Sequence, residues 1–493
     1  MRTLLTLSVL SLLLSAFVVA QDSQPVSRVL PATSQRNVFV QKIRLNSEQK
    51  LLTFPDREGG VLAITSEGHQ NSRISLQRAS EDLVSIRSAT WERLPSFNPR
   101  KPRLSLSPAL EPTNLTRNID ASQTYSRKSF FLHVTSDPLT SPAAYRLIHG
   151  DLCAEGDHVR VYLDSTYSES ERYTELGQKI IHCLEESILP AAEKLAGCFA
   201  DVDGDGKLSI LLSPALDQLQ GGKTSVKGFV RSSDFRLDVP RPFSNHCDVI
   251  YLNTECPDDT NHLTLLAHEY WHVLQFSYRL VRSHESLPIQ EDWICEGSAH
   301  LAEQVLGGDG DNLTKRIECW LQSPEDSPLM VSDYYSSGLW RHDGCRGGAY
   351  LFFRWCHRNY GDQILSDLLT SPSRDHACLE ELTGLPIDQL RINFLRDLLE
   401  ERELESTLAP EDRLLNDHIF PDQSLTDLKV YELPQVSSVT CELAPTAQMF
   451  VRVRSGDRLV IRSDEPIHVQ AVFLPDRQTS EIAIRSDSQR VRN

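Results

Sequence analysis

Residues 265–277 read Leu-Leu-Ala-His-Glu-Tyr-Trp-His-Val-Leu-Gln-Phe-Ser, and this stretch decides the fold. Apart from His268, Glu269 and His272 it carries no ionisable group except a tyrosine, which is typical of a buried helix because a stray buried charge costs several kcal/mol. The HExxH spacing places both histidines on one helical face, where their imidazoles can bind one metal ion. Glu269 can then activate a water on that ion. The stretch therefore predicts a zinc-dependent hydrolase.

A catalytic zinc site needs a third protein ligand and one open coordination position. Residues 293–303 read Trp-Ile-Cys-Glu-Gly-Ser-Ala-His-Leu-Ala-Glu and form a second predicted helix. Glu296 lies near its start, with 23 residues between it and His272, a gap that suits a loop folding one helix back against the other. Glu296 is the predicted third ligand, and His300 and Glu303 are its alternatives on the same helical face.

The two segments resemble those of the gluzincin metallopeptidases, in which HExxH is followed by W-x-x-E-G-x-A. Within that group the chain is most similar to the hyicolysin-like bacterial peptidases. Besides the two zinc segments, the resemblance is carried by DVDGDGKLSILLSP (201–214), VIYLN (249–253) and GGAYLFFRWCHRNYGDQIL (347–365). It covers roughly residues 155–400 and does not extend to residues 21–125. It implies a zincin-like fold and peptidase activity.

By matching position, the resemblance implies that His268, His272 and Glu296 are zinc ligands and that Glu269 is the general base. Two residues depart from the family pattern. Cys295 stands where such motifs often carry Asn, and we predict that it is a small buried group or part of a disulfide rather than a ligand. His300 stands where some gluzincins carry an acid that braces a ligand histidine. Glu303 or Asp292 is expected to provide that brace instead.

A hydrolase of this type also needs a donor for the developing oxyanion. The candidates are Tyr334, Tyr335, His342 and His300, of which the first three lie in a predicted loop. Separately, Asp201, Asp203 and Asp205 alternate as in a calcium-binding loop, with Gly206 at the sharp turn. Position 12 of that loop is Leu212 instead of the usual glutamate, so a polar turn is preferred and calcium stays an alternative.

Composition narrows the class of protein. The chain has 493 residues and a net charge of 50 − 68 = −18, with 40% hydrophobic and 24% charged residues. These values describe a globular protein of more than one domain and argue against nucleic-acid binding. After residue 20 no stretch approaches the roughly 18 apolar residues of a membrane span.

Residues 1–20 read MRTLLTLSVLSLLLSAFVVA, which is typical of a signal peptide cleaved after Ala20. An N-terminal membrane anchor is the alternative. We therefore expect a secreted or periplasmic protein. Eleven cysteines without a CxxC pair fit a compartment that permits disulfide bonds.

The predicted fold class is α+β. Residues 21–125 form an N-terminal region with a Pro-rich linker and are a candidate pro-segment. Residues 126–420 form a zincin-like catalytic domain with a mixed sheet and the active-site helix. Residues 421–493 form a small all-β module, indicated by period-two patterning.

The predicted function is a secreted zinc endopeptidase that acts on protein or peptide substrates, with zinc as cofactor. An aminopeptidase is an alternative, although no G-x-M-E-N-type segment for holding a substrate N-terminus is evident. The other alternative is an inactive zincin-like protein with a binding or structural role. The strand VIYLN (249–253), just before the HExxH helix, is a hypothetical site for strand pairing with substrate, provided that it lies at a sheet edge.

Overall fold

The structure is a computed structural model. It describes residues 39–473 apart from 47–48, 55–58, 80–87, 89–91, 94–125, 168–169, 223–225, 255–260, 284–286, 309, 405–407, 409–412, 416–419, 421–422 and 434–437. The predicted signal peptide and the Pro-rich linker lie outside these residues. Within them, no helix is both long enough and apolar enough to cross a membrane.

A mixed sheet supports the HExxH helix, which confirms the expected α+β class. Its strand order is β10-β11-β9-β8-β7-β6. The strands are β6 (Arg127–His133), β7 (Tyr145–Glu155), β8 (Val159–Asp164), β9 (Leu208–Leu212), β10 (Gly228–Phe229) and β11 (Val249–Leu252). The pairs β8–β9 and β9–β11 are parallel, and the others are antiparallel. Strands β8, β9 and β11 are buried along their whole length, as parallel strands covered on both faces usually are.

The strand VIYLN does not lie at the edge of this sheet. Residues Val249–Leu252 (β11) pair with β9 on one side and with β10 on the other. The hypothesis that VIYLN pairs with a substrate is therefore wrong. Among the described strands, β10 has one partner and so forms the edge next to the HExxH helix.

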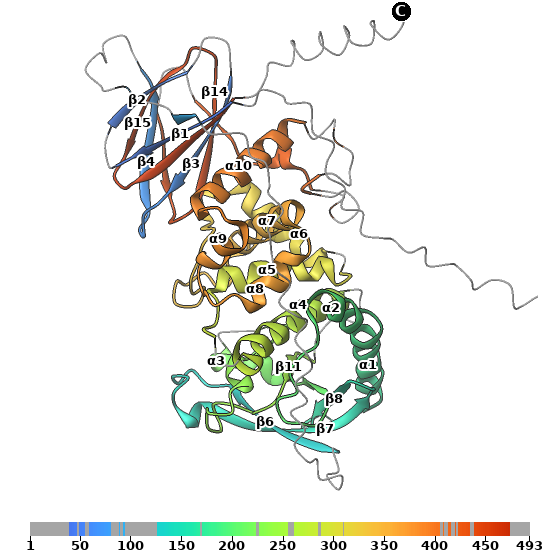
Figure 1. Cartoon of the computed structure of the whole chain (residues 1–493). Helices are drawn as coiled ribbons and strands as arrows, with labels where there is room; N and C mark the ends of the chain where they lie inside the picture. Colours follow the sequence, from blue (N-terminus) through green and yellow to red (C-terminus); the bar gives the residue numbers. More distant parts are fainter. Residues whose placement is uncertain are drawn as a thin grey trace, which may run out of the picture. The chain divides into compact units, whose positions relative to one another are not determined.

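Helices make up most of the chain between residues 170 and 404 (Figure 1). They are α1 (Ser170–Cys183), α2 (Leu189–Ala196), α3 (Leu219–Gly222), α4 (Asn261–Phe276), α5 (Asp292–Val305), α6 (Asp311–Gln322), α7 (Asp343–Tyr360), α8 (Gln363–Thr370), α9 (Ala377–Thr383) and α10 (Ile387–Leu404). One buried apolar cluster joins these helices to one face of the mixed sheet.

Glycines allow α5, α6 and α7 to pack closely. A Cβ on Gly297 of α5 would lie 2.5 Å from the ring of Phe353 on α7. A Cβ on Gly347 of α7 would lie 2.0 Å from the carbonyl oxygen of Arg316 on α6. Neither position has room for a side chain. This close packing places the N-terminal half of α7 against the part of α5 that follows Trp293.

The C-terminal β region shares two sheets with strands from the N-terminal region. The orders are β12-β14-β3-β16-β1-β5 and β13-β4-β15-β2. The strands are β1 (Phe39–Leu45), β2 (Gln49–Thr53), β3 (Gly60–Ser66), β4 (Ser72–Arg78), β5 (Glu92–Arg93), β12 (Tyr431–Glu432), β13 (Val439–Leu443), β14 (Gln448–Val453), β15 (Arg458–Ser463) and β16 (Ile467–Phe473). Blue N-terminal strands accordingly lie next to orange-red C-terminal strands in Figure 1.

Strand β3 is buried on both faces and belongs to two cores. Val61 and Ala63 lie in the cluster that contains the helices, whereas Leu62 and Ile64 lie in the core between the two β sheets. The strand therefore lacks the alternation of polar and apolar residues that marks a half-buried strand. The predicted domain boundaries at residues 125 and 420 remain predictions.

Candidate metal centre

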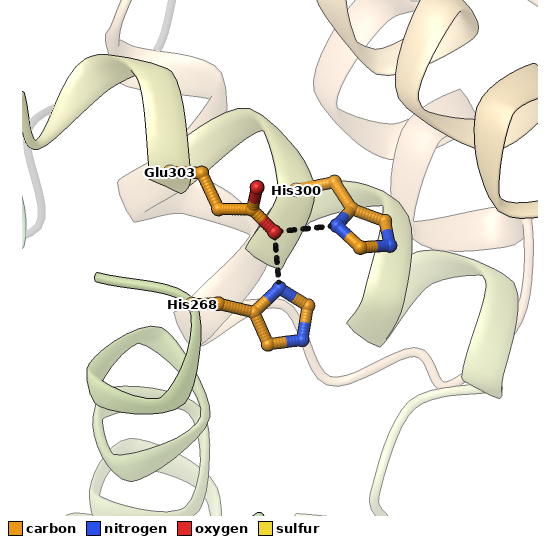
Figure 2. Close-up of side chains that lie close together, drawn as sticks. All are labelled: His268, His300 and Glu303. Atoms are coloured by element: carbon orange, nitrogen blue, oxygen red, sulfur yellow. Dashed lines mark hydrogen bonds and ion pairs between the residues drawn. The ribbon is translucent and has the colours of Figure 1, made fainter. Parts of the chain in front are cut away.

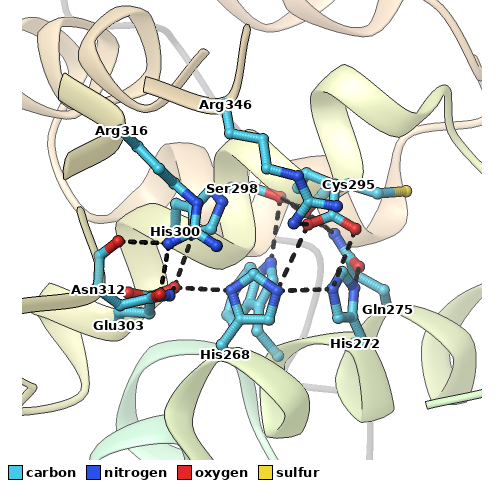
Figure 3. A network of polar contacts seen from close by, with 12 residues as sticks. His268, His272, Gln275, Cys295, Ser298, His300, Glu303, Asn312, Arg316 and Arg346 are labelled. Atoms are coloured by element: carbon cyan, nitrogen blue, oxygen red, sulfur yellow. Dashed lines mark hydrogen bonds and ion pairs between the residues drawn. The ribbon is translucent and has the colours of Figure 1, made fainter. Parts of the chain in front are cut away.

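Helices α4 and α5 bring the three predicted zinc ligands together. The Nε2 atoms of His268 and His272 are 3.2 Å apart (Figure 3). From α5, the Glu296 oxygens lie 3.5 Å from His268 Nε2 and 3.8 Å from His272 Nε2. Ligand atoms about 2.0–2.1 Å from a tetrahedral zinc are about 3.3–3.4 Å from one another. The three side chains could therefore hold one metal ion.

Hydrogen bonds on the far side of each imidazole fix its tautomer. His268 Nδ1 is 2.8 Å from Glu303 Oε1, and His272 Nδ1 is 2.8 Å from Gln275 Oε1. Gln275 directs its amide nitrogen toward the Cys295 carbonyl and Ser298 Oγ, so its oxygen must face His272. Both Nδ1 atoms therefore carry the hydrogen in the neutral rings. Two Nε2 lone pairs then face each other at 3.2 Å, an arrangement that requires a cation.

The pKa values indicate how the metal-free protein meets this requirement. Burial acts to lower the pKa of His268, but hydrogen bonds to Glu296 and Glu303 outweigh it and raise the pKa to about 10. Burial lowers the pKa of His272 to about 4. Besides its two Nδ1 hydrogens, the pair therefore holds one further proton at neutral pH, on His268 Nε2. A metal ion in the same place would replace that proton.

Glu303 is a buried carboxylate that binds two histidines at once (Figure 2). Its Oε1 lies 2.8 Å from His268 Nδ1, 2.7 Å from His300 Nδ1 and 3.1 Å from Asn312 Nδ2. Burial opposes its ionisation, but the charges and hydrogen bonds of His300 and His268 lower its pKa to about 2. Of the two residues expected to brace His268, Glu303 is the one in position.

Two overlapping sets of residues can hold a metal ion, and both include His268. The sets are His268, His272 and Glu296, and His268, His300 and Glu303. The first set is favoured, because the second would break the hydrogen bonds that Glu303 accepts from both histidines. Asp292, the other expected brace, instead accepts a hydrogen bond from the Tyr334 amide at 2.7 Å.

Glu269 lies beneath the edge strand β10. A Cβ on Gly228 of β10 would lie 3.4 Å from Glu269 Cγ. Burial raises the pKa of Glu269 to about 7, partly opposed by the charge of His268. A carboxylate with such a pKa can both accept and release a proton near neutrality.

Arg346 is a site residue that the sequence did not reveal. From α7, its Nη1 lies 2.9 Å from Glu296 Oε2, and its guanidinium lies 5.6 Å from the ring centroid of Tyr334. Burial acts to raise the pKa of Glu296, but Arg346, His268 and His272 together outweigh it and hold that pKa well below its usual range. Arg346 Nε and the Tyr334 hydroxyl are buried and have no hydrogen-bond partner among the described residues. In the sequence Arg346 directly precedes the Gly-Gly-aromatic run of α7, and nothing in that pattern marks it as a site residue.

The other three predicted oxyanion donors occupy different positions. Tyr335 is 58% exposed. His342 caps α7, where its Nδ1 accepts the amide hydrogen of Cys345. His300 is fully buried and donates to Glu303. The structure thus brings only Tyr334 of these four candidates into contact with Arg346, next to Glu296.

Cys295 is buried, as expected for a small apolar group. Its thiol lies 3.4 Å from the Gln290 carbonyl oxygen, and burial raises its pKa. It therefore carries its proton and is not a thiolate ligand. The ten cysteines within the described residues are free, so they contain no disulfide bond, and Cys256 lies outside these residues.

Asp201, Asp203 and Asp205 gather at the turn before β9, with one oxygen of each within 4.8 Å of the others. They form a separate group from the histidines.

Comparison with models of known protein families and with curated protein sequences finds no match to this chain. Function must therefore be inferred from the geometry of these sites.

Proposed function

We propose that the chain is a zinc-dependent peptidase of the gluzincin type that cleaves protein or peptide substrates at internal bonds. One observation carries the proposal. Two buried imidazoles face each other through their Nε2 atoms at 3.2 Å beside the Glu296 carboxylate, and their Nδ1 atoms are both bound to acceptors. This donor set suits zinc, which favours nitrogen and oxygen ligands in a tetrahedron.

A bound zinc ion would supply a Lewis acid that polarises the scissile carbonyl and lowers the pKa of water toward ~7. Glu269, buried and next to the ligand His268 in sequence, would take a proton from that water and pass it to the leaving amine. Arg346 Nε and the Tyr334 hydroxyl are the donors available to the developing oxyanion.

Strand β10 is the proposed docking edge for the substrate backbone. An extended peptide can add to a free sheet edge through main-chain hydrogen bonds. Gly228 of β10 lies against Glu269, so a peptide paired with this strand would pass next to the proposed general base. In this proposal β10 takes the substrate-pairing role that was first suggested for Val249–Leu252.

The alternatives receive less support. An inactive binding protein has no need of a buried acid between the two histidines of the HExxH helix, yet Glu269 is in that position and is buried. For an aminopeptidase we expect an acidic group that holds the substrate N-terminus, and Arg346 instead brings positive charge to the centre. The signal peptide predicted at residues 1–20 places this activity outside the cytoplasm, as part of the same proposal.

The test compares wild type with Glu269→Gln and His272→Ala. We expect one zinc per chain in wild type and in Glu269→Gln, and much less in His272→Ala. Casein cleavage is expected only in wild type. An N-terminally blocked peptide should also be cleaved, which an aminopeptidase would not do. Wild type without zinc, or Glu269→Gln with full activity, would refute the proposal.

A further inference from the structure

His300 is a fully buried histidine with one satisfied and one unsatisfied ring nitrogen. Its Nδ1 lies 2.7 Å from Glu303 Oε1, and because an ionised carboxylate only accepts hydrogen bonds, the Nδ1 hydrogen is the one donated. Its Nε2 is buried and has no hydrogen-bond partner among the described residues. An unpaired buried acceptor costs stability, so this ring is an unfavourable choice for packing alone.

The Glu303 oxygen that His300 contacts is the meeting point of three helices. Its donors are His268 on α4 at 2.8 Å, His300 on α5 at 2.7 Å and Asn312 on α6 at 3.1 Å. Figure 2 shows both imidazoles directed at this one oxygen. The second oxygen, Oε2, is buried and has no hydrogen-bond partner within the described parts of the chain. The donors to Oε1 therefore determine how the carboxylate is oriented.

Two of these donors hold Glu303 independently of His268. His300 precedes Glu303 by one turn of α5, so their contact forms within a single helix. Asn312 reaches the same oxygen from the first turn of α6 (Figure 3). Arg316 Nη1 donates to Asn312 Oδ1, so the amide nitrogen of Asn312 must face Glu303. His300 and Asn312 thus fix the acceptor that His268 meets.

The His300 ring also lies against the ring of His268. Their centroids are 4.7 Å apart, and the two planes are inclined by 47°. This contact limits how far the His268 ring can turn, while Glu303 fixes its Nδ1. Both restraints act on a ring whose Nε2 must point at a bound ion, and such outer contacts determine how well a histidine binds a metal.

We propose that His300 is a positioning residue, which holds Glu303 so that this carboxylate braces His268. This role rests on the proposed zinc centre. As a metal ligand through Nδ1, His300 would lose its hydrogen bond to Glu303. As an oxyanion donor it would need a hydrogen on Nε2, but in the neutral ring that hydrogen is on Nδ1. Orientation of Glu303 is the role that uses the ring as it is found.

The test compares His300→Phe with His300→Asn in the full-length protein, with zinc as the probe. His300→Phe keeps a ring against His268 but removes both the donor and the unpaired Nε2. We expect zinc affinity, measured by competition with a chelator, to fall about tenfold, at the lower end of the effect of changing an outer partner. The melting temperature of the metal-free protein should stay the same or rise, because an unpaired buried acceptor is lost.

His300→Asn should show the opposite order. Its amide can place an N–H near the position of Nδ1, but the shorter side chain leaves part of the buried space empty. We therefore expect it to retain more zinc affinity than His300→Phe and to have a lower metal-free melting temperature. A purely structural role would make zinc affinity follow stability in both variants.

Asn312→Leu tests the same carboxylate from α6 and remains available if His300→Phe does not fold. It removes a donor to Glu303 and should also weaken zinc binding. Asn359→Leu is the matched control. Asn359 is likewise a half-buried asparagine, and its Nδ2 donates to the Trp355 carbonyl oxygen at 2.9 Å, at the end of α7 away from Arg346. It should leave zinc affinity unchanged.

Combining His300→Phe with Glu303→Gln shows whether His300 acts through that carboxylate. The loss in zinc affinity of the double variant should be smaller than the product of the two single losses. Zinc affinity of His300→Phe within about twofold of wild type, or losses that multiply fully, would overturn this role and leave the proposed zinc centre intact. Wild type that binds no zinc would overturn the proposed function and this role with it.

Discussion

Replacing Glu303 by glutamine tests whether this carboxylate braces the metal centre. The substitution keeps the size of the side chain and an oxygen that can accept from His268 Nδ1, now 2.8 Å from Glu303 Oε1. It removes the negative charge that His268, His300 and Asn312 share through that same oxygen. The expected effect is a weaker zinc complex with a largely preserved fold.

The magnitude follows from the contacts. Mutation of the outer partner of a metal-bound histidine typically weakens metal binding about 10- to 100-fold. That factor corresponds to about 1.4–2.7 kcal/mol. Because zinc stabilises only the folded chain, the zinc-dependent gain in unfolding free energy should fall by the same amount. The loss in zinc affinity and the loss in zinc-dependent stabilisation are therefore expected to correspond to the same free energy.

Zinc affinity would be measured at pH 7 by competition with a chromophoric chelator, and unfolding would be followed with and without zinc. Glu325→Gln is the matched control, because Glu325 is a buried acid that hydrogen-bonds Tyr431 Oη at 2.5 Å, outside the site. It should lower stability and leave zinc affinity unchanged. An affinity within about twofold of wild type for Glu303→Gln, or an equal loss in Glu325→Gln, would refute the bracing role.

Three other predictions concern the same centre. Arg346→Met should lower kcat by about 10²–10³, the usual effect of losing one oxyanion donor. Tyr335→Phe, at an exposed position, should leave kcat unchanged. Equal kcat for Arg346→Met and wild type in steady-state assays would exclude Arg346 from the reaction. Gly228→Val should abolish cleavage while zinc content stays normal, because even a Cβ there would lie 2.9 Å from Leu252 Cδ2; normal cleavage would place the substrate elsewhere. Zinc binding should release at least one proton at pH 8, the one from His268, because the pKa of His268 in the metal-free protein is raised to about 10. Because deprotonated His268 binds the metal, zinc affinity should rise about tenfold per pH unit between pH 7 and 9. Calorimetry in buffers of different ionisation enthalpy measures the protons released, and no release at pH 8 would contradict the prediction.

The part of the site that depends on local geometry could be predicted from the sequence. Residues 265–277 were expected to be helical, and the helix is observed as Asn261–Phe276. Residues four apart share a helical face in any tertiary context, so the convergence of His268 and His272 needed no knowledge of the fold. The contact of both with Glu296 needed only that α5 fold back on α4.

The part that depends on distant packing could not be predicted. Arg346 reaches Glu296 across 50 positions because α7 packs against α5 where Gly297 leaves room for Phe353. No local pattern reports such a contact. Likewise β10 is only two residues long, too short for periodicity to distinguish it from a loop. The hypothesis of substrate pairing therefore rested on the longer, more apolar strand Val249–Leu252, on condition that it lay at an edge, and that strand is central.

The prediction that residues 21–125 are a pro-segment has to accommodate the way the β strands are shared. Strand β3 lies between β14 and β16, and β4 lies between β13 and β15. Withdrawing them would break ladders on both sides of each strand and leave unpaired edges that favour aggregation. A proteolytic cut within the Pro-rich residues 94–125 would leave the N-terminal strands held by these ladders. Activation by such a cut would then produce two chains that stay associated, so any change in activity would have to arise near the cut rather than from loss of the N-terminal region.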